Sequence, residues 1–337
     1  MNNENLGNEE TQVDEQVQHL IQTNPKVTYI LNNKHELVNY QGFWHPCSPH
    51  YLKTILLFQS HFRARNTDII IASFPKTGTT WLKSLLFSIV NRFNYPITET
   101  PLLKHHPHEI VHRLEVDLYG NAFEYPRPHH LDQLPSPRLF STHLPYTSLP
   151  ESVIDSGCRI VYISRNPFDT FVSYYLFSIE VTKKFEGENY VAPSIEQIFE
   201  EYSAGRIVCG PFFNHVVGYK KSLEQTDNVL FLQYEDLKEN TVLYVKKLAE
   251  FVGVPFSAQE EKEGVVEDII RLCSIQNLKE LEVNKSGVFN KWFEKKSYFR
   301  KGEVGDWIHH FTPSMVEKMN KLMEEKLAGT GLSFRMA

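Results

Sequence analysis

The sequence feature that most constrains the fold is residues 69–83, which read Ile-Ile-Ile-Ala-Ser-Phe-Pro-Lys-Thr-Gly-Thr-Thr-Trp-Leu-Lys. A buried strand, a tight loop and a helix that begins at two threonines build an anion site, because the free N–H groups and the positive end of the helix dipole face the ligand. Lys76 adds a full positive charge. The Walker A pattern is absent, since Lys76 precedes Gly78 instead of following it. The stretch therefore predicts a phosphate site unlike that of an ATPase; the alternative is a purely structural strand–turn–helix joint.

Strand and helix patterns alternate along the rest of the chain. Apolar, β-branched runs predict strands at residues 68–73, 138–140, 158–164 and 228–233, and helical apolar spacing predicts helices at 79–93, 241–252, 258–272 and 313–327. Apolar strands separated by helices indicate a central parallel sheet covered on both faces. Because no internal repeat or low-complexity linker divides the chain, we expect a single α/β domain at 24–337 that contains the P-loop-like strand–loop–helix.

Composition and charge argue against several classes of protein. The formal charge of −6 is opposite to that of most nucleic-acid-binding proteins, and no apolar run is long enough to cross a membrane. Four widely spaced cysteines and a polar N-terminus without a signal pattern predict free thiols in the reducing cytoplasm. Residues 1–23 carry five acidic residues before any basic one, so we expect a mobile acidic tail there.

Two further polar segments follow predicted strands, where open α/β sheets bind their ligands. His143 lies in Ser-Thr-His-Leu-Pro; a lone His is more often structural, but its place after a strand makes it a candidate general base. Arg165 ends another predicted strand, where a guanidinium suits bidentate capture of a phosphate, and Ser173 on the next helix adds a hydroxyl. The alternative for Arg165 is an ion pair with Asp169, four residues later.

A fourth segment, residues 298–307, carries two adjacent cations followed by a glycine. Arg300, Lys301 and Gly302 fit a flexible clamp on a phosphate, and the alternative is a basic surface turn.

These four segments, in this order and spacing, resemble the soluble PAPS-dependent sulfotransferase family, where PAPS is 3′-phosphoadenosine 5′-phosphosulfate. The resemblance runs from about residue 42 to residue 334. It implies a 5′-phosphosulfate loop made by Lys76, Thr77, Gly78, Thr79, Thr80 and Trp81. It implies 3′-phosphate contacts from Arg165, Ser173, Arg300, Lys301 and Gly302, and a tyrosine near the adenine at Tyr234. It also implies a stretch beside the nucleotide made by Cys273, Ser274, Ile275, Gln276, Asn277 and Leu278, with Ser274 as its main polar contact.

The resemblance implies in-line transfer of a sulfuryl group from PAPS to an acceptor hydroxyl. His143 would take the hydroxyl proton, and Lys76 would stabilise the negative charge on the leaving bridging oxygen. By analogy with phosphoryl transfer, positioning and charge stabilisation would do most of the work. The sulfuryl group carries less charge than a phosphoryl group and no acidic cluster suited to Mg²⁺ stands out, so no metal is expected.

Two positions depart from the animal members of that family. Many of those carry a lysine two residues before the catalytic histidine, whereas this chain has Ser141, which looks more like plant members. Of the animal dimer motif only Thr312 and Glu317 fit, so we expect a monomer or a weak dimer.

The expected acceptor is a small hydroxylated molecule in an aromatic pocket near His143. The proposed lining residues are Trp44, His105, His106, Tyr174, Tyr175 and Phe177, although several of these would serve equally well as core residues. An aromatic pocket suits a flat molecule, so we expect a flavonoid or other phenolic of plant specialised metabolism. The family's plant members also act on brassinosteroids, hydroxyjasmonates and desulfoglucosinolates, which remain alternatives. A nucleoside kinase would need Walker A spacing and acidic metal ligands, and an inactive nucleotide-binding protein would have lost Lys76 or His143.

Overall fold

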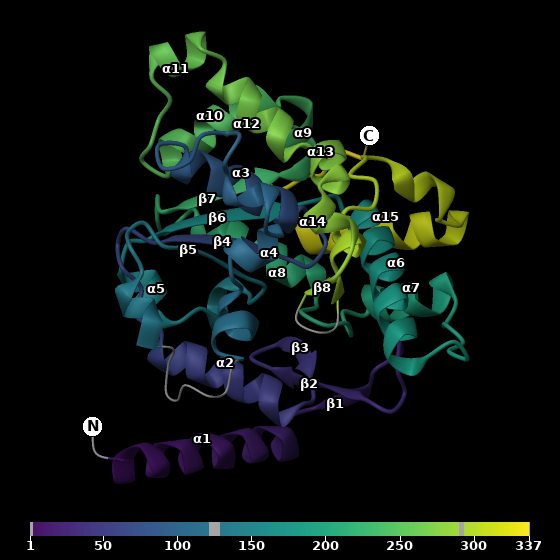
Figure 1. Cartoon of the computed structure of the whole chain (residues 1–337). Coiled ribbons are helices and arrows are strands. Elements are labelled where there is room, and N and C mark those ends of the chain that lie inside the picture. The colour runs from purple at the N-terminus through teal and green to yellow at the C-terminus, as the bar shows by residue number, and fades with distance from the viewer. Residues whose placement is uncertain (1–2, 121–128, 290–292, 337) are drawn as a thin grey trace.

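The computed structural model describes residues 3–120, 129–289 and 293–336. Within these residues a central sheet of parallel strands has the order β5-β4-β6-β7. Its strands are β4 (Ile69–Ser73), β5 (Leu139–Thr142), β6 (Arg159–Ser164) and β7 (Val229–Gln233). Helices cover both faces of this sheet, so the predicted α/β class is confirmed (Figure 1).

One face of the sheet is covered by helices that follow β4 and β7. Ile69 and Ile71 of β4 and Val161 of β6 pack here with Leu85 and Leu248 in one apolar cluster. Because strand side chains alternate between the two faces, alternate residues of the same strands point to the opposite face. The helices that contribute to this cluster are α3 (Thr79–Asn91), α9 (Tyr234–Glu239), α10 (Thr241–Phe251) and α12 (Val265–Cys273). Helices α11 (Ala258–Lys262) and α13 (Ile275–Glu280) contact α12, and α14 (Glu282–Lys285) contacts α13.

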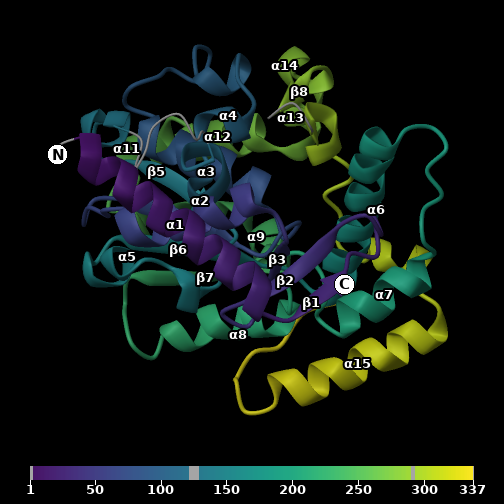
Figure 2. The same ribbon diagram turned by 90° about the horizontal axis from the view of Figure 1, so that it is seen from below.

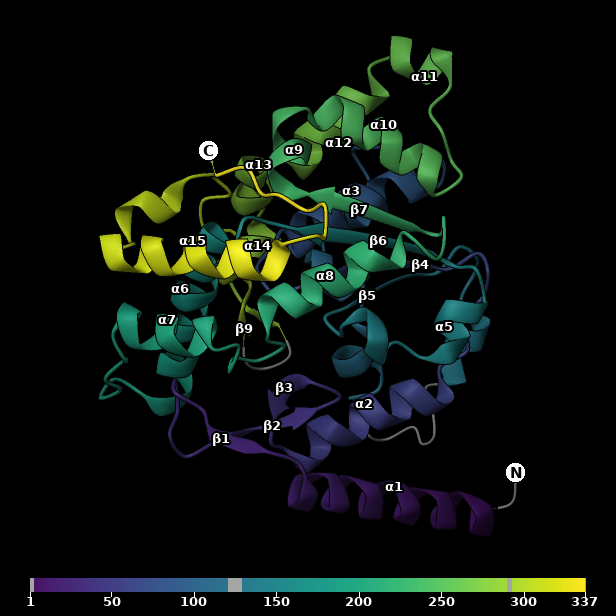
Figure 3. The same ribbon diagram turned by 180° about the vertical axis from the view of Figure 1, so that it is seen from behind.

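The opposite face is covered by a larger, aromatic-rich cluster. Ile70, Ala72 and Tyr162 of the sheet pack here with Phe168 and Val216. Figure 3 shows α8 crossing this side, with α7 and α15 beside it. The helices that contribute to this cluster are α2 (Pro49–His61), α5 (Glu151–Asp155), α6 (Pro167–Glu186), α7 (Ile195–Ser203), α8 (Phe212–Ser222) and α15 (Pro313–Leu327).

Shorter elements complete the fold. Two antiparallel groups pair as β1-β2-β3 and β8-β9, with bounds β1 (Lys26–Thr28), β2 (Glu36–Tyr40), β3 (Phe43–Pro46), β8 (Val288–Phe289) and β9 (Phe293–Glu294). The short helical segments are α4 (Pro107–Ile110), a π-helical turn at Leu114–Leu118, and single turns at Pro101–Leu103, His129–Gln133, Tyr146–Ser148, Lys295–Tyr298 and Asp306–His309. Among the described residues no helix is both long and apolar enough to pass through a bilayer.

The N-terminal segment, where we expect a mobile acidic tail, contains a helix that contacts the rest of the domain. Asn3–Thr23 forms helix α1, which runs alongside α2 (Figures 1 and 2). Val13, Val17 and Leu20 are buried, and they are spaced at the three- and four-residue intervals of one helix face. The polar composition of the segment concealed this narrow apolar stripe.

The predicted helix and strand boundaries agree with the structure to within two residues, with one exception. The predicted helix at 258–272 is two helices, because Gly264 adopts a left-handed conformation with φ 78° and ends the first.

Candidate active site

The loop between β4 and α3 has the strained backbone that its sequence suggests. Lys76 and Gly78 both have positive φ angles, 72° and 113°. A Cβ atom on Gly78 would lie 2.7 Å from Cδ2 of Tyr234, so only glycine fits there. Thr77 turns away from the loop, since its hydroxyl donates to the carbonyls of Phe74 (2.8 Å) and Ile163 (3.0 Å). The loop is thereby fixed to the neighbouring strand β6.

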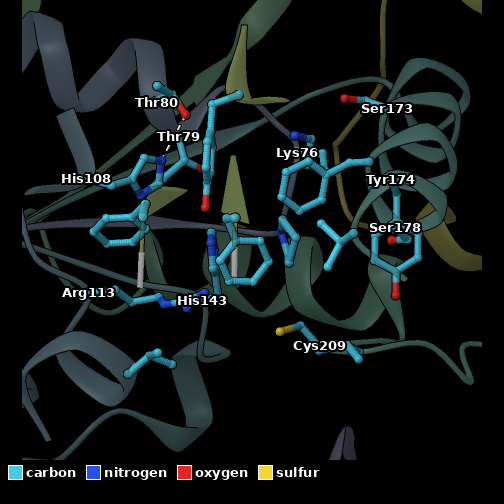
Figure 4. Close-up of a pocket in the computed structure, with 18 of the residues that line it drawn as sticks. Lys76, Thr79, Thr80, His108, Arg113, His143, Ser173, Tyr174, Ser178 and Cys209 are labelled. Carbon is cyan, nitrogen blue, oxygen red and sulfur yellow. Dashed lines mark hydrogen bonds between the residues drawn. The ribbon is translucent and has the colours of Figure 1, made fainter. Parts of the chain in front are cut away.

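One cavity of about 650 Å³ lies where the loops after β4, β5 and β6 converge. Figure 4 shows Lys76, Thr79, Thr80, His143 and Ser173 among its lining residues. The predicted site residues that line it are Lys76, Gly78, Thr79, Thr80, Trp81, His143, Arg165, Ser173, Tyr234, Ile275, Leu278, Arg300, Lys301 and Gly302. Residues up to 226 positions apart in the sequence, from Lys76 to Gly302, thus share one cavity.

Five predicted nucleotide contacts do not line this cavity. Thr77 is buried in the loop, and Cys273 is buried against the hydroxyl of Ser88 (3.4 Å). The Ser274 hydroxyl caps α13 by accepting from the Asn277 N–H (3.2 Å). The Asn277 amide donates to a backbone carbonyl, and Gln276 is exposed outside the cavity. The remaining two residues of the 273–278 segment, Ile275 and Leu278, contribute only apolar surface.

His143 follows β5 and is held by three hydrogen bonds. Its Nδ1 lies 2.7 Å from the carbonyl oxygen of Ser73, so Nδ1 carries the proton and donates it. Its backbone N–H donates to Glu115 (2.9 Å), and its backbone carbonyl accepts from His215 Nε2 (3.0 Å). Burial, followed by the positive charge of Arg113, holds the pKa of His143 well below its usual range. The ring is therefore neutral near pH 7, with the Nε2 lone pair available.

Lys76 lies among aromatic rings at the centre of the cavity. Its Nζ is 3.7 Å from the centre of the Phe177 ring and 5.6 Å from that of Tyr298. Burial, followed by the charge of Arg300, lowers the pKa of Lys76 to about 7. An incoming anion would restore the charged form.

Arg165 and Arg300 each retain an unused donor. Arg165 donates to the carbonyl of Glu303 and lies 3.4 Å from Asp169, so the ion pair considered from the sequence is present. Arg300 donates to Asp306 at 2.6 Å. Among the described residues, the buried Nε of each arginine has no hydrogen-bond partner. Buried unpaired donors are rare, and here both belong to residues that line the cavity.

Two buried aspartates hold the C-terminal clamp, and sequence analysis assigned neither of them this role. Asp169 on α6 accepts from the backbone N–H groups of Gly305 (2.8 Å) and Trp307 (3.0 Å). Asp306 accepts from Arg300 and from Lys301 (2.5 Å). Burial opposes ionisation of Asp306, but the bonds from Lys301 and Arg300 outweigh it and lower its pKa to about 2. The two cations are thus held in place by a carboxylate that remains ionised.

The acceptor side of the cavity only partly matches the predicted set. Tyr174 and Phe177 line it. His105 is exposed, and His106 is buried behind His108, with ring centres 5.2 Å apart. Trp44 and Tyr175 are half-buried outside the cavity. The lining residues that sequence analysis missed come from separate parts of the chain and carry no shared motif; they include Tyr29, Tyr51, His108, Arg113, Cys209 and Tyr298.

Comparison with known proteins places this geometry in a family. The family model for the sulfotransferase domain matches residues 66–331. The chain belongs to the sulfotransferase family. Sulfotransferases similar to it include cytosolic sulfotransferase 15 of Arabidopsis thaliana, 43% identical over 88% of this chain and 82% of that protein. Flavonol sulfotransferase-like protein of Flaveria bidentis is 47% identical over 89% of this chain and 94% of that protein.

Solved structures agree with this assignment. A sulphotransferase of Arabidopsis thaliana has a TM-score of 0.70 and 34% identity, covering 94% of both chains. A mouse sulfotransferase crystallised with PAP, the desulfated nucleotide, has a TM-score of 0.63 and 27% identity, covering 87% of this chain and 94% of that one. The sequence-based assignment to plant-type sulfotransferases is confirmed. The enzyme class is that of sulfotransferases and not the nucleoside kinase considered as an alternative.

Proposed function

We propose that this sulfotransferase moves the sulfuryl group of PAPS to a hydroxyl of a small, uncharged, aromatic acceptor. The observation that carries the proposal is that His143 lies in the same cavity as the cationic residues Lys76, Arg165 and Arg300. The hydrogen bond from Nδ1 of His143 to the Ser73 carbonyl leaves Nε2 free to act as a base. A base and an anion site that share one cavity provide the two halves of a sulfuryl transfer.

The residues present fit a nucleotide with two anionic ends. Arg165 and Arg300, to which the family resemblance assigns the 3′-phosphate, both line the cavity. Gly78 and Gly302 let the backbone of the two loops pack directly against other lining residues, since a Cβ on Gly302 would lie 2.2 Å from Ile275 Cδ1. The PAP bound in the mouse relative supports the same assignment. When bound, PAPS supplies the activated sulfuryl group.

Each of the two catalytic residues has a defined task in this scheme. Nε2 of His143 accepts the proton of the acceptor hydroxyl as the oxygen attacks, and the bond to the Ser73 carbonyl keeps the ring in the required tautomer. The ammonium of Lys76 stabilises the charge that develops on the leaving oxygen. The rings of Phe177 and Tyr298 keep water away from that ammonium and strengthen its electrostatic effect.

The acceptor side of the cavity favours a neutral molecule. Its surface is mostly aromatic and aliphatic, and Arg113 is the lining cation with the largest effect on His143. Arg113 lies 3.9 Å from Glu115 and its pKa is raised because Asp117 and then Glu115 outweigh the effect of burial. A carboxylate on the acceptor would therefore face a cation that is already balanced. This argues for a flavonoid or other phenolic, with a steroid or desulfoglucosinolate next, and against a hydroxyjasmonate acid; the flavonol name of the Flaveria relative agrees.

The remaining parts of the proposal concern setting and assembly. The Arabidopsis relatives are named cytosolic, which supports a cytoplasmic location for this chain. We propose that residues 24–337 act as one catalytic domain and that the chain is a monomer or weak dimer. Thr312, one of the two residues that fit the animal dimer motif, serves instead as the N-cap of α15 by accepting from the Met315 N–H.

The proposal is tested with purified protein, labelled PAPS and a panel of acceptors. The panel contains a flavonol, a neutral steroid, a desulfoglucosinolate, and hydroxyjasmonate both as free acid and as methyl ester. We expect labelled product with the flavonol, and more product from the ester than from the acid. Transfer confined to the free acid would contradict the uncharged-acceptor argument.

The role of His143 is tested by substitution with a matched control. His143→Ala should lower turnover by about 10²- to 10⁴-fold while the Kd for PAP stays within about threefold. His105→Ala changes an exposed histidine outside the cavity and should leave both values unchanged. Full activity in His143→Ala would show that another group is the base.

A further inference from the structure

Helix α3 carries a buried lysine that the reaction described above does not use. Lys83 is 1% exposed and lies one turn after Thr80. Its Nζ is 3.0 Å from Nδ1 of His108 and 2.7 Å from the carbonyl oxygen of Val111. Burying an ammonium group is costly, and these two bonds offset part of that cost and hold Lys83 in one position.

The chain of contacts continues from His108 to the phosphosulfate loop. His108 belongs to the short helix α4, and its Nε2 lies 3.0 Å from Oγ1 of Thr80 (Figure 4). His108 and Thr80 both line the cavity, whereas Lys83 lies behind them. The Tyr298 ring, with its centre 4.4 Å from that of His108, packs against the imidazole. A buried cation is thus connected to a hydroxyl of the anion site through a single imidazole.

The chemistry of Lys83, His108 and Thr80 indicates which group donates in each of these hydrogen bonds. Burial lowers the pKa of Lys83 to about 7, partly opposed by the charge of Asp117. In its ammonium form Lys83 has donors and no acceptor, so Nδ1 of His108 then accepts from Lys83. Burial, followed by the charge of Lys83, holds the pKa of His108 well below its usual range, and the neutral ring then carries its one proton on Nε2. That N–H donates to Oγ1 of Thr80. The hydroxyl proton of Thr80 remains free to point into the cavity.

The neighbouring threonine has a different arrangement. Thr79 Oγ1 lies 2.7 Å from Oγ of Ser73, and the same Ser73 hydroxyl lies 3.3 Å from Nδ1 of His143. The two adjacent threonines are therefore connected to different histidines. Thr79 belongs to the network around His143, and Thr80 belongs to the network of His108 and Lys83.

We propose that Lys83 and His108 are positioning residues that orient the Thr80 hydroxyl as a hydrogen-bond donor to the 5′-phosphosulfate end of the nucleotide. The inference rests on the proposed function, because it assumes that PAPS occupies this cavity. A donor fixed before the nucleotide binds loses less entropy on binding than a freely rotating hydroxyl. The polarising effect of the Lys83 charge through His108 further strengthens the donated bond.

The first test compares two replacements of His108 by titration calorimetry with PAP. His108→Phe keeps a ring but has no donor, and we expect the Kd for PAP to rise about tenfold. His108→Gln places an amide donor near the Nε2 position, and its Kd should return to within about threefold of the wild-type value. In steady-state assays His108→Phe should raise the KM for PAPS and leave that for the acceptor unchanged. Equal Kd values for wild type and His108→Phe would overturn the proposal that His108 orients the Thr80 hydroxyl.

A double-mutant cycle shows whether the effect passes through the threonine. Thr80→Val removes the hydroxyl with little change in shape, and adding His108→Phe or Lys83→Met to it should weaken PAP binding no further. Additive losses would mean that His108 acts by packing alone, and would overturn the inference. Thermal unfolding of each variant identifies any that fail to fold. If His108→Phe is among them, the Kd values for PAP of Thr80→Val and His108→Gln test the proposal instead.

Two results separate this inference from the proposed function. His105→Phe, at an exposed position, should leave PAP binding unchanged and serves as the control for ring substitution. If wild-type protein binds PAP and the His108 variants bind PAP equally well, only the proposed positioning role of Lys83 and His108 is refuted. Wild-type protein that does not bind PAP would refute both.

Discussion

Replacing Gly302 by alanine tests the close packing of the nucleotide clamp. Gly302 has a φ of 66°, and its carbonyl accepts the hydroxyl proton of Tyr234 at 2.8 Å. A Cβ atom would lie 2.2 Å from Cδ1 of Ile275 and 3.3 Å from its Cγ1 and Cγ2. The left-handed backbone costs a residue with a Cβ about 1–2 kcal/mol. The overlap adds about 1–3 kcal/mol, because inserted methyl groups in packed sites cost that much.

The two costs are separable by a compensating substitution. Ile275→Val removes Cδ1, the atom that overlaps, and leaves the backbone strain in place. We expect Gly302→Ala to weaken PAP binding at least tenfold in titration calorimetry, and Gly302→Ala with Ile275→Val to recover part of that loss. Gly329→Ala is the matched control, since Gly329 has a φ of 73° and no atom within 4 Å of its Cβ position. Unchanged affinity in Gly302→Ala, or no recovery in the double variant, would refute the reasoning.

Three further predictions follow from buried charges. Asp169→Ala removes the acceptor of two backbone N–H groups and the ion-pair partner of the buried Arg165. It should weaken PAP binding more than tenfold in calorimetry. An unchanged Kd would show that other residues hold the clamp in place. Burial lowers the pKa of Lys76 to about 7, so its charge is present below that pH and lost above it. The Kd for PAP should therefore rise as pH increases from 7 to 9, and Lys76→Met should flatten that profile, whereas parallel profiles would assign the titration to another group. Arg138 and Asp68 form a buried pair at 2.5 Å, and Arg138→Met should lower the free energy of unfolding by about 3–5 kcal/mol in urea titrations; a loss below about 1 kcal/mol would contradict the pairing argument.

The parts of the site predicted from sequence are those encoded by adjacent residues. The strand–loop–helix from Ile69 to Lys83 carries its own signal, because a β-branched run, a glycine at positive φ and two threonines must follow one another to build it. His143 and Arg165 were found in the same way, as polar residues at the ends of apolar strands. Parallel strands bring their carboxyl ends to one edge of a sheet, so these residues meet without further information.

Residues that needed a long-range contact to reveal their role were missed or misplaced. Asp169 looked like a local partner of Arg165, yet it also binds the backbone of a loop 136 residues later, at Gly305. His108 had no motif of its own, whereas the adjacent His105 and His106, which were predicted, lie outside the cavity. Side chains in short loops point wherever the packing of distant elements directs them, so neither periodicity nor spacing could tell these histidines apart.

The sequence alone therefore determined the fold class and predicted the anion loop and the candidate base, because each depends on residues next to one another or on the topology of a parallel sheet. Only the tertiary structure decided which side of each loop faces the cavity. It also decided that Lys83 is buried against His108, and that Asp306 holds the clamp cations Arg300 and Lys301. These arrangements depend on the positions of buried charges relative to one another, and buried charges are positioned by partners that fold from elsewhere in the chain.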